Sequence, residues 1–227
     1  MKITKLVLNT NRLASEKKFY SAASGFELIA STPDHFTVKI GWSELTFRKS
    51  RRPHTYHYCF LLPSNKLQQG IEWLAKRVEL IEVERGKYTQ FFDSWNAESV
   101  YFLDKSGNVA EFIVRYDLKN ETTAPFGIDQ ILGINEIGLP TTDIETTNKV
   151  LEQEIKTTFW KGNFQRFGTN GTQEGLFLLP NYEVKETWFP TELRIAPEPL
   201  EVTVKNGRAK YSLTYVAEHL NISAITA

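Results

Sequence analysis

Glu111 is the residue whose type and surroundings most directly indicate chemistry in this sequence. It follows a tight turn at 104–108, of sequence DKSGN, in which glycine and asparagine favour positive φ angles. The turn places Glu111 on the second strand of a hairpin, on the same face as Val109 and Ile113. A carboxylate flanked by aliphatic side chains is costly to bury unless another group pairs with it. We therefore expect a partner for Glu111.

Other residues capable of chemistry give weaker signals. Cys59 is the only cysteine, which excludes an intramolecular disulfide and a cysteine-based zinc site, and we expect it to be buried rather than nucleophilic. His54 and His57 are three residues apart, so in a strand they point to opposite faces. The glycine-rich stretch 168–175 lacks the Gly-Lys-Ser/Thr ending of a phosphate-binding loop and predicts a hairpin loop.

Composition excludes several classes of protein. The 227 residues include 27 Lys+Arg and 27 Asp+Glu, and a net charge of zero argues against nucleic-acid binding. The basic run 48–52 is expected to be a solvated linker. No apolar run approaches the roughly 18 residues of a membrane span, and a single cysteine fits a reducing compartment. We therefore expect a cytoplasmic protein whose partner is a small molecule, with no membrane and no nucleic acid.

The elements that would position these residues repeat along the chain. Three stretches have the order strand, polar turn and amphipathic helix, followed by three further strands. In each stretch the last leucine of the first strand precedes the first aliphatic residue of the helix by five positions: Leu8 and Leu13, Leu62 and Leu67, Leu139 and Ile144. The pattern predicts an α+β protein of repeated βαβββ modules. One module is too small to bury both faces of its sheet, so two must pack together around a concave ligand site.

The modules suggest two domains. Residues 1–118 are expected to contain the first two modules, paired with each other, and the polar stretch 119–126 forms the boundary. Residues 127–227 are expected to contain the third module and a C-terminal β-hairpin, because Asn206-Gly207 separates two strand-like segments. An odd number of modules leaves one unpaired. Either the tail completes a degenerate fourth module, or a second subunit supplies the partner, and we expect a homodimer.

One segment carries a family resemblance. The stretch 92–115 contains Val100-Tyr101-Phe102, then Asp104, Gly107-Asn108 and Glu111, spaced as V-Y-F-x-D-x-x-G-N-x-x-E. It resembles the last strand pair of vicinal oxygen chelate proteins, the superfamily of glyoxalases, bleomycin-resistance proteins and ring-cleaving dioxygenases. The resemblance covers 1–118 in good register and 130–180 more loosely. It implies that the modules form a half-open mixed β-barrel around a divalent metal, with the helices packed on the outside.

The resemblance also implies a set of site residues. Superfamily ligands lie on the first and last strands of each module, and these positions correspond to Lys5, Glu44, His57 and Glu111. The expected metal ligands are His57, Glu111 and Glu44, holding Zn, Mn, Fe or Ni, and the expected catalytic residues are Glu111 and Lys5. Lys5 departs from the usual His or Gln, and its ammonium could instead replace the metal between the carboxylates. Glu136 lies in the first strand of the third module, which is expected to be structural because its last strand carries no carboxylate.

These residues favour two functions and disfavour a third. The first is a metal-dependent lyase or isomerase of the glyoxalase type, which binds a small oxygen-rich molecule and uses Glu111 or Glu44 as the base. The alternative is a non-catalytic sequestering protein of the bleomycin-resistance type, with Lys5 closing the metal site. An extradiol ring-cleaving dioxygenase needs two histidines and one carboxylate, and only His57 corresponds to a ligand position.

Overall fold

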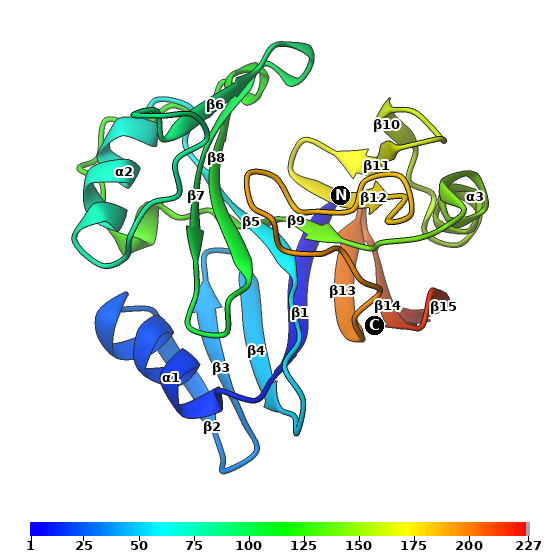
Figure 1. The fold of residues 1–227 in the computed structure, drawn as a ribbon, viewed down its shortest axis with the longest axis horizontal. Helices are drawn as coiled ribbons and strands as arrows, with labels where there is room; N and C mark the ends of the chain where they lie inside the picture. Colours follow the sequence, from blue (N-terminus) through cyan, green and yellow to red (C-terminus); the bar gives the residue numbers. More distant parts are fainter. Residues whose placement is uncertain (226–227) are drawn as a thin grey trace.

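The structure is a computed structural model that describes residues 1–225, and it is built from two mixed β-sheets (Figure 1). The first sheet contains, in spatial order, β15 (His219–Ile225), β14 (Ala209–Val216), β13 (Leu200–Asn206), β1 (Lys2–Thr10), β4 (Ser43–Lys49), β3 (His35–Ile40) and β2 (Glu27–Ser31). The second contains β10 (Phe159–Gly162), β11 (Phe167–Thr172), β12 (Gly175–Pro180), β9 (Gly133–Gly138), β5 (His57–Leu62), β8 (Val109–Arg115), β7 (Ala97–Leu103) and β6 (Thr89–Phe92).

Three α-helices pack on the outer faces of these sheets (Figure 1). Helix α1 (Leu13–Lys17) continues into a π-helical turn and lies on β3 and β4, whereas α2 (Leu67–Ala75) lies on β7 and β8. Helix α3 (Ile144–Ile155) contacts β11 and β12, and it begins where the Asp143 carboxylate accepts a hydrogen bond from the Thr146 amide at 3.0 Å. The α+β class and the half-open mixed barrel with outer helices are thereby confirmed.

Each predicted module is present, but the modules pair differently from the expectation. In all three modules the first strand runs parallel to the fourth: β1 to β4, β5 to β8 and β9 to β12. The second module does not pair with the first. It pairs with the third, through the antiparallel strands β5 and β9. Strand pairing therefore crosses the boundary expected between 1–118 and 127–227.

The first module pairs instead with the segment after residue 199. Strand β13 lies antiparallel to β1, and β14 and β15 extend the same sheet outwards. This segment is a three-stranded meander, one strand longer than the expected hairpin. It occupies the place of a fourth module, so the first module has its partner within the chain.

The polarity of the strands explains this pairing. In β1 and β4 the buried residues alternate with polar ones, so one face of the first sheet packs in the core and the other meets solvent. Strands β5, β8, β9 and β12 are buried at every position. The two modules whose central strands are buried on both faces thus lie side by side in one sheet, whereas the module with one polar face pairs with the amphipathic meander.

Hydrogen bonds join the two sheets at buried positions. The Ser43 hydroxyl donates to the Ile3 carbonyl at 2.7 Å in the first sheet and accepts from the Ile134 amide at 2.8 Å in the second. Farther along the barrel, Tyr58 donates to Asp104 at 2.6 Å and also hydrogen-bonds Tyr20, which follows α1. The two halves are therefore joined by two separate groups of buried hydrogen bonds as well as by one hydrophobic core.

No helix within residues 1–225 is long and apolar enough to cross a membrane.

Candidate metal centre

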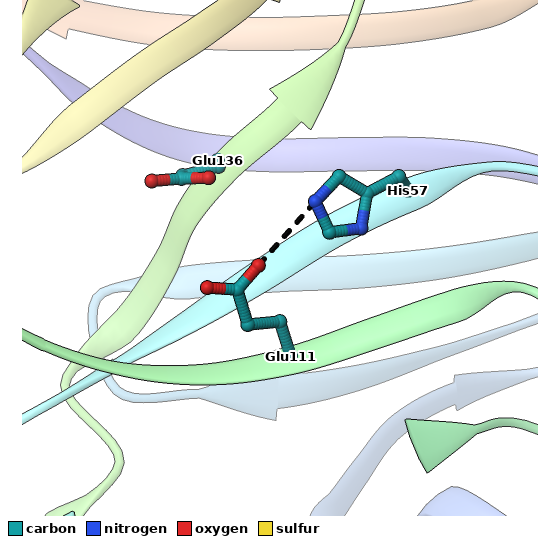
Figure 2. A group of neighbouring side chains, drawn as sticks. All are labelled: His57, Glu111 and Glu136. Carbon is teal, nitrogen blue, oxygen red and sulfur yellow. Dashed lines mark ion pairs between the residues drawn. The ribbon is translucent and has the colours of Figure 1, made fainter. Parts of the chain in front are cut away.

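Three buried side chains converge on the concave face of the second sheet (Figure 2). His57 comes from β5, Glu111 from β8 and Glu136 from β9, so the three strands at the centre of the sheet each supply one group. Their ligating atoms all lie within 4.8 Å of one another. A metal with bonds of about 2.1 Å holds its ligands roughly 3–4 Å apart, so a small side-chain movement suffices to close this group around an ion.

The hydrogen bonds of His57 direct its Nε2, the nitrogen that would bind a metal, toward the other two residues of the group. Its Nδ1 lies 3.0 Å from the Val109 carbonyl, which can only accept, so Nδ1 carries a proton. Its Nε2 faces Glu111 Oε2 at 3.3 Å (Figure 2). This is the arrangement in which a second hydrogen bond fixes the ring of a metal-binding histidine. The donor set of one imidazole and two carboxylates suits Mn²⁺, Fe²⁺ or Zn²⁺.

The electrostatics of the group show how strongly the three residues interact. Burial alone would lower the pKa of His57, but the hydrogen bond and the charge of Glu111, together with Glu136, raise that pKa above its ordinary value. Burial raises the pKa of Glu136; Arg115 opposes this change and Glu111 adds to it. The site therefore favours a positive charge next to Glu111, supplied by protonated His57 or by a bound cation.

Arg115 is a fourth buried member of this group. It lies at the end of β8, fully buried, and its Nη2 donates to the Glu136 carboxylate while its Nε donates to Asn135 Oδ1 at 2.9 Å. The rings of Trp95 and Trp160 lie 5.4 and 5.3 Å from its guanidinium carbon. Arg115 thus neutralises one of the two carboxylates and fixes Glu136 in position.

A cavity of about 420 Å³ opens above the three converging residues. This volume is within the range of about 300–1,000 Å³ typical of small-molecule sites. Besides His57, Glu111 and Glu136, its lining consists of aromatic residues, one leucine and two basic residues: Phe92, Trp95, Tyr101, Phe167, Trp188, Phe189, Leu178, Arg166 and Lys185. The Trp188 ring lies 5.1 Å from that of His57, centroid to centroid.

The structure divides the expected site residues between two places. His57 and Glu111 lie together, as expected, in the second sheet. Lys5 and Glu44 do not join them, because β1 and β4 belong to the first sheet. There, Lys5 Nζ lies 3.1 Å from Glu44 Oε2 in a separate, polar cavity of about 350 Å³. Since both side chains are partly exposed to solvent, their ion pair needs no metal to satisfy it.

Glu136 takes the place that the sequence-based set gave to Glu44. Cys59 in β5 pairs with Glu111 in β8, Glu136 in β9 pairs with Leu176 in β12, and Cys59 and Glu136 lie opposite each other across β5 and β9. Glu136 is therefore the counterpart of Cys59, and Leu176 is the counterpart of Glu111. The signal was present in the sequence, because Glu136 lies in the first strand of the third module. The last strand of that module carries no carboxylate, which led to the opposite interpretation.

The chain is similar in structure to several solved proteins, although no family model matches it and no curated protein matches its sequence. A candidate dioxygenase from Bacillus subtilis aligns with a TM-score of 0.59 and 13% identity, over 99% of this chain and 84% of that one. Two shorter proteins align over about half of this chain. A lactoylglutathione lyase from Agrobacterium tumefaciens has a TM-score of 0.40 and 18% identity, over 49% of this chain and 92% of its own. A glyoxalase/bleomycin resistance protein/dioxygenase from Alicyclobacillus acidocaldarius has a TM-score of 0.41 and 17% identity, over 53% and 96%.

The similarity to the Bacillus subtilis protein, which covers nearly the whole of this chain, agrees with the architecture described above. The paired modules of the second sheet, with their first strands adjacent and antiparallel, match the resemblance found in the segment 92–115. At such low identity, the similarity concerns the fold alone. The chain therefore has the vicinal oxygen chelate fold.

Proposed function

We propose that this protein binds a divalent metal through His57, Glu111 and Glu136 and acts on a small, oxygen-rich molecule in the cavity above them. The reaction we propose is that of a lyase or isomerase of the glyoxalase type. The observation that carries the proposal is the convergence of three buried ligand atoms at the base of a cavity lined mainly by aromatic residues.

Each residue has a role that follows from its position. A divalent ion bound here would act as a Lewis acid toward a substrate oxygen. Glu111 faces His57 and, unlike Glu136, is not held by an arginine, so in this proposal Glu111 accepts the proton from the substrate. Glu136, held by Arg115, is a positioning group and ligand. The aromatic walls exclude water from the reacting atoms.

A non-catalytic binding protein is the second candidate, and one observation favours it. Glu136 pairs with Arg115, and Glu111 pairs with His57, so both carboxylates already have partners supplied by the chain. Arg115 and His57 thus supply the internal positive charge beside the carboxylates that the sequence analysis expected from Lys5. In this alternative the cavity binds its ligand with no metal at its base.

Metal analysis of the purified protein tests the proposal. After incubation with Mn²⁺, Fe²⁺, Zn²⁺ or Ni²⁺ and removal of free ions, we expect one equivalent of metal per chain by elemental analysis. Glu111→Gln should lose it, because an amide is a much weaker ligand than a carboxylate. Glu44→Gln is the matched control and should retain it, because Glu44 lies in the other sheet. Absence of metal from the wild type, or its loss from both variants, contradicts the proposed centre.

The homodimer and the cytoplasmic location expected from the sequence remain proposals. The argument for a dimer was an unpaired module, and β13 now pairs with that module inside the chain. Light scattering decides the question, since a monomer has a mass of 26.1 kDa. A mass twice as large would support the homodimer.

A further inference from the structure

One segment of the cavity wall has no counterpart among the repeated modules. The strap at 181–199 connects β12 to β13 and contributes Lys185, Trp188 and Phe189 to the lining. Its backbone is tied to itself, because the Trp188 amide donates to the Leu193 carbonyl at 2.9 Å. It is also tied to the sheet, because Arg166 donates to the Val184 carbonyl at 2.9 Å. The strap is thus an ordered wall of the cavity.

The strap meets the second sheet through aromatic rings. Trp188 is buried against His57, and Phe189 lies edge-on to Tyr101 with a centroid distance of 5.6 Å. Phe92 and Trp95 continue this wall, with their ring centroids 5.7 Å apart. Rings on several sides of one space favour a flat aromatic ligand, which they can contact face-on or edge-on.

Two basic side chains in the same lining have no acidic partner. Within residues 1–225, no carboxylate lies within 4 Å of the charged nitrogens of Lys185 or Arg166. Lys185 Nζ donates to the Thr187 carbonyl at 2.7 Å, which leaves two of its three protons for other acceptors. The base of the cavity is acidic. Its two basic residues lie elsewhere in the lining, Lys185 on the strap and Arg166 immediately before β11, so the lining has two chemically different parts.

We infer that the cavity binds an aromatic molecule carrying an anionic group, with the anion at Lys185 and Arg166 and the ring against the aromatic part of the lining. This inference deepens the proposed function of the same cavity and rests on it for the role of His57, Glu111 and Glu136 at the base. The ligand class is therefore an aromatic carboxylate or a similar aromatic anion, rather than a neutral sugar or an aliphatic acid.

The surroundings of Lys185 support this assignment. Burial and the like charge of Arg166 lower the pKa of Lys185 to about 8. Two neighbouring cations in a partly buried wall are unfavourable until an anion offsets them, and a bound carboxylate would offset both. The free protein thus keeps a local excess of positive charge where the ligand's negative group would lie.

Four small probes separate the parts of the inference. Phenylacetate carries both a ring and an anion, phenylacetamide only the ring, cyclohexylacetate an anion without aromaticity, and acetate only the anion. Titration of the full chain is followed by tryptophan fluorescence and by NMR line broadening of each probe. We expect phenylacetate to bind about tenfold or more tightly than phenylacetamide, with cyclohexylacetate weaker and acetate weakest. Equal binding of phenylacetate and phenylacetamide, or no binding of phenylacetate, overturns the inference.

Variants of Lys185 locate the anion. Lys185→Met should abolish the preference for phenylacetate while leaving phenylacetamide binding unchanged, and Lys185→Arg should restore the preference. Lys149→Met is the control and should behave as wild type, because Lys149 is exposed on α3 and pairs with Glu145. A preference that survives in Lys185→Met places the anion elsewhere and overturns the assignment.

The same titrations distinguish this inference from the proposed metal centre. They are repeated in EDTA and with the Glu111→Gln variant. If phenylacetate retains its preference in both, the ligand class is supported even when no metal binds. If metal binds stoichiometrically but the phenylacetate preference is absent, the inference fails while the metal centre stands.

Discussion

Arg115 is the residue on which the geometry of the site most depends. A fully buried guanidinium is stable only when its charge and donors have partners, and the carboxylate of Glu136 supplies the charge. The pair also fixes the Glu136 carboxylate near His57 and Glu111. One arginine therefore serves both the stability of the sheet and the position of a candidate ligand.

Substitution of Arg115 should lower the free energy of unfolding, and a second substitution at Glu136 should recover part of that loss. We expect Arg115→Met to lower the free energy of unfolding by about 3–5 kcal/mol, because it leaves Glu136 buried without a countercharge. The double variant Arg115→Met/Glu136→Gln should recover much of this loss, since an amide needs no countercharge. Urea unfolding of the wild type, Arg115→Met, Glu136→Gln and the double variant measures the coupling, and additive effects would contradict a direct Arg115–Glu136 interaction.

At this scale the sequence predicts part of the site. Glu111 was identifiable because a carboxylate between aliphatic residues needs a partner, and the resemblance added His57. Arg115 and Glu136 were not identifiable as a pair, because they lie on different modules and meet only when β8 and β9 flank β5. Lys5 and Glu44 lie on the first and last strands of the first module, at positions equivalent to those on the first and last strands of the other modules. No local pattern reveals that their strands belong to the other sheet.

At the scale of single elements, β9 shapes the cavity because one of its residues, Gly138, has no side chain. Gly138 ends β9 next to the strap, and a Cβ added there would lie 2.5 Å from the Trp188 ring. The absence of a side chain is what allows Trp188 to lie against the sheet and contact His57. The strap is thus positioned by a glycine in the strand that also carries Glu136.

Gly138→Ala should displace the strap. We expect a loss of about 1–3 kcal/mol in the free energy of unfolding, because the interior cannot accept the added methyl without moving Trp188. The double variant Gly138→Ala/Trp188→Phe should be more stable than Gly138→Ala, since a smaller ring leaves room. Denaturant unfolding and tryptophan emission measure the change. Gly127→Ala is a control, because its Cβ would meet only the mobile end of the Asp129 side chain.

Sequence patterns predicted most elements but missed those whose composition contradicts their structure. Strand β11 contains Gly168, Asn170 and Gly171, which are typical of loops, yet it is held between β10 and β12. Strand β15 was not expected, and it forms because β14 offers it a full antiparallel register. In each case, neighbouring strands outweigh local propensity.

At the scale of the whole molecule, a pair of buried carboxylates joins the two halves. Glu16 lies on α1 of the first module and is fully buried; Asp104 follows β7 of the second. Burial, with the charge of Asp104 next in importance, raises the pKa of Glu16 to about 9. Burial likewise raises the pKa of Asp104, against the hydrogen bonds from Tyr58 and Asn108. The contact between the halves therefore favours protonated carboxyl groups.

This contact makes stability depend on pH. The folded state binds a proton at Glu16 that the unfolded state releases above its ordinary pKa of about 4.5, so stability is complete below that pH and falls as the pH rises toward 9. We expect the wild type to lose on the order of a few kcal/mol between pH 5 and pH 8.5. Glu16→Gln should reduce this slope, whereas exposed Glu27→Gln should leave it unchanged. Parallel pH profiles of wild type and Glu16→Gln, from urea unfolding, would contradict the role of Glu16.

The pairing of modules also has a consequence for how the protein is made. Strands β5 to β12 form the second sheet from one continuous stretch, whereas the first sheet joins β1 to β13, nearly two hundred residues later. During synthesis, the inner stretch can complete its sheet while 200–225 are still at the ribosome. The outer edge of β1 must meanwhile stay unpaired, and an exposed strand edge invites pairing with another chain. The first module therefore depends, until β13 has been synthesised, on a partner strand that has not yet emerged.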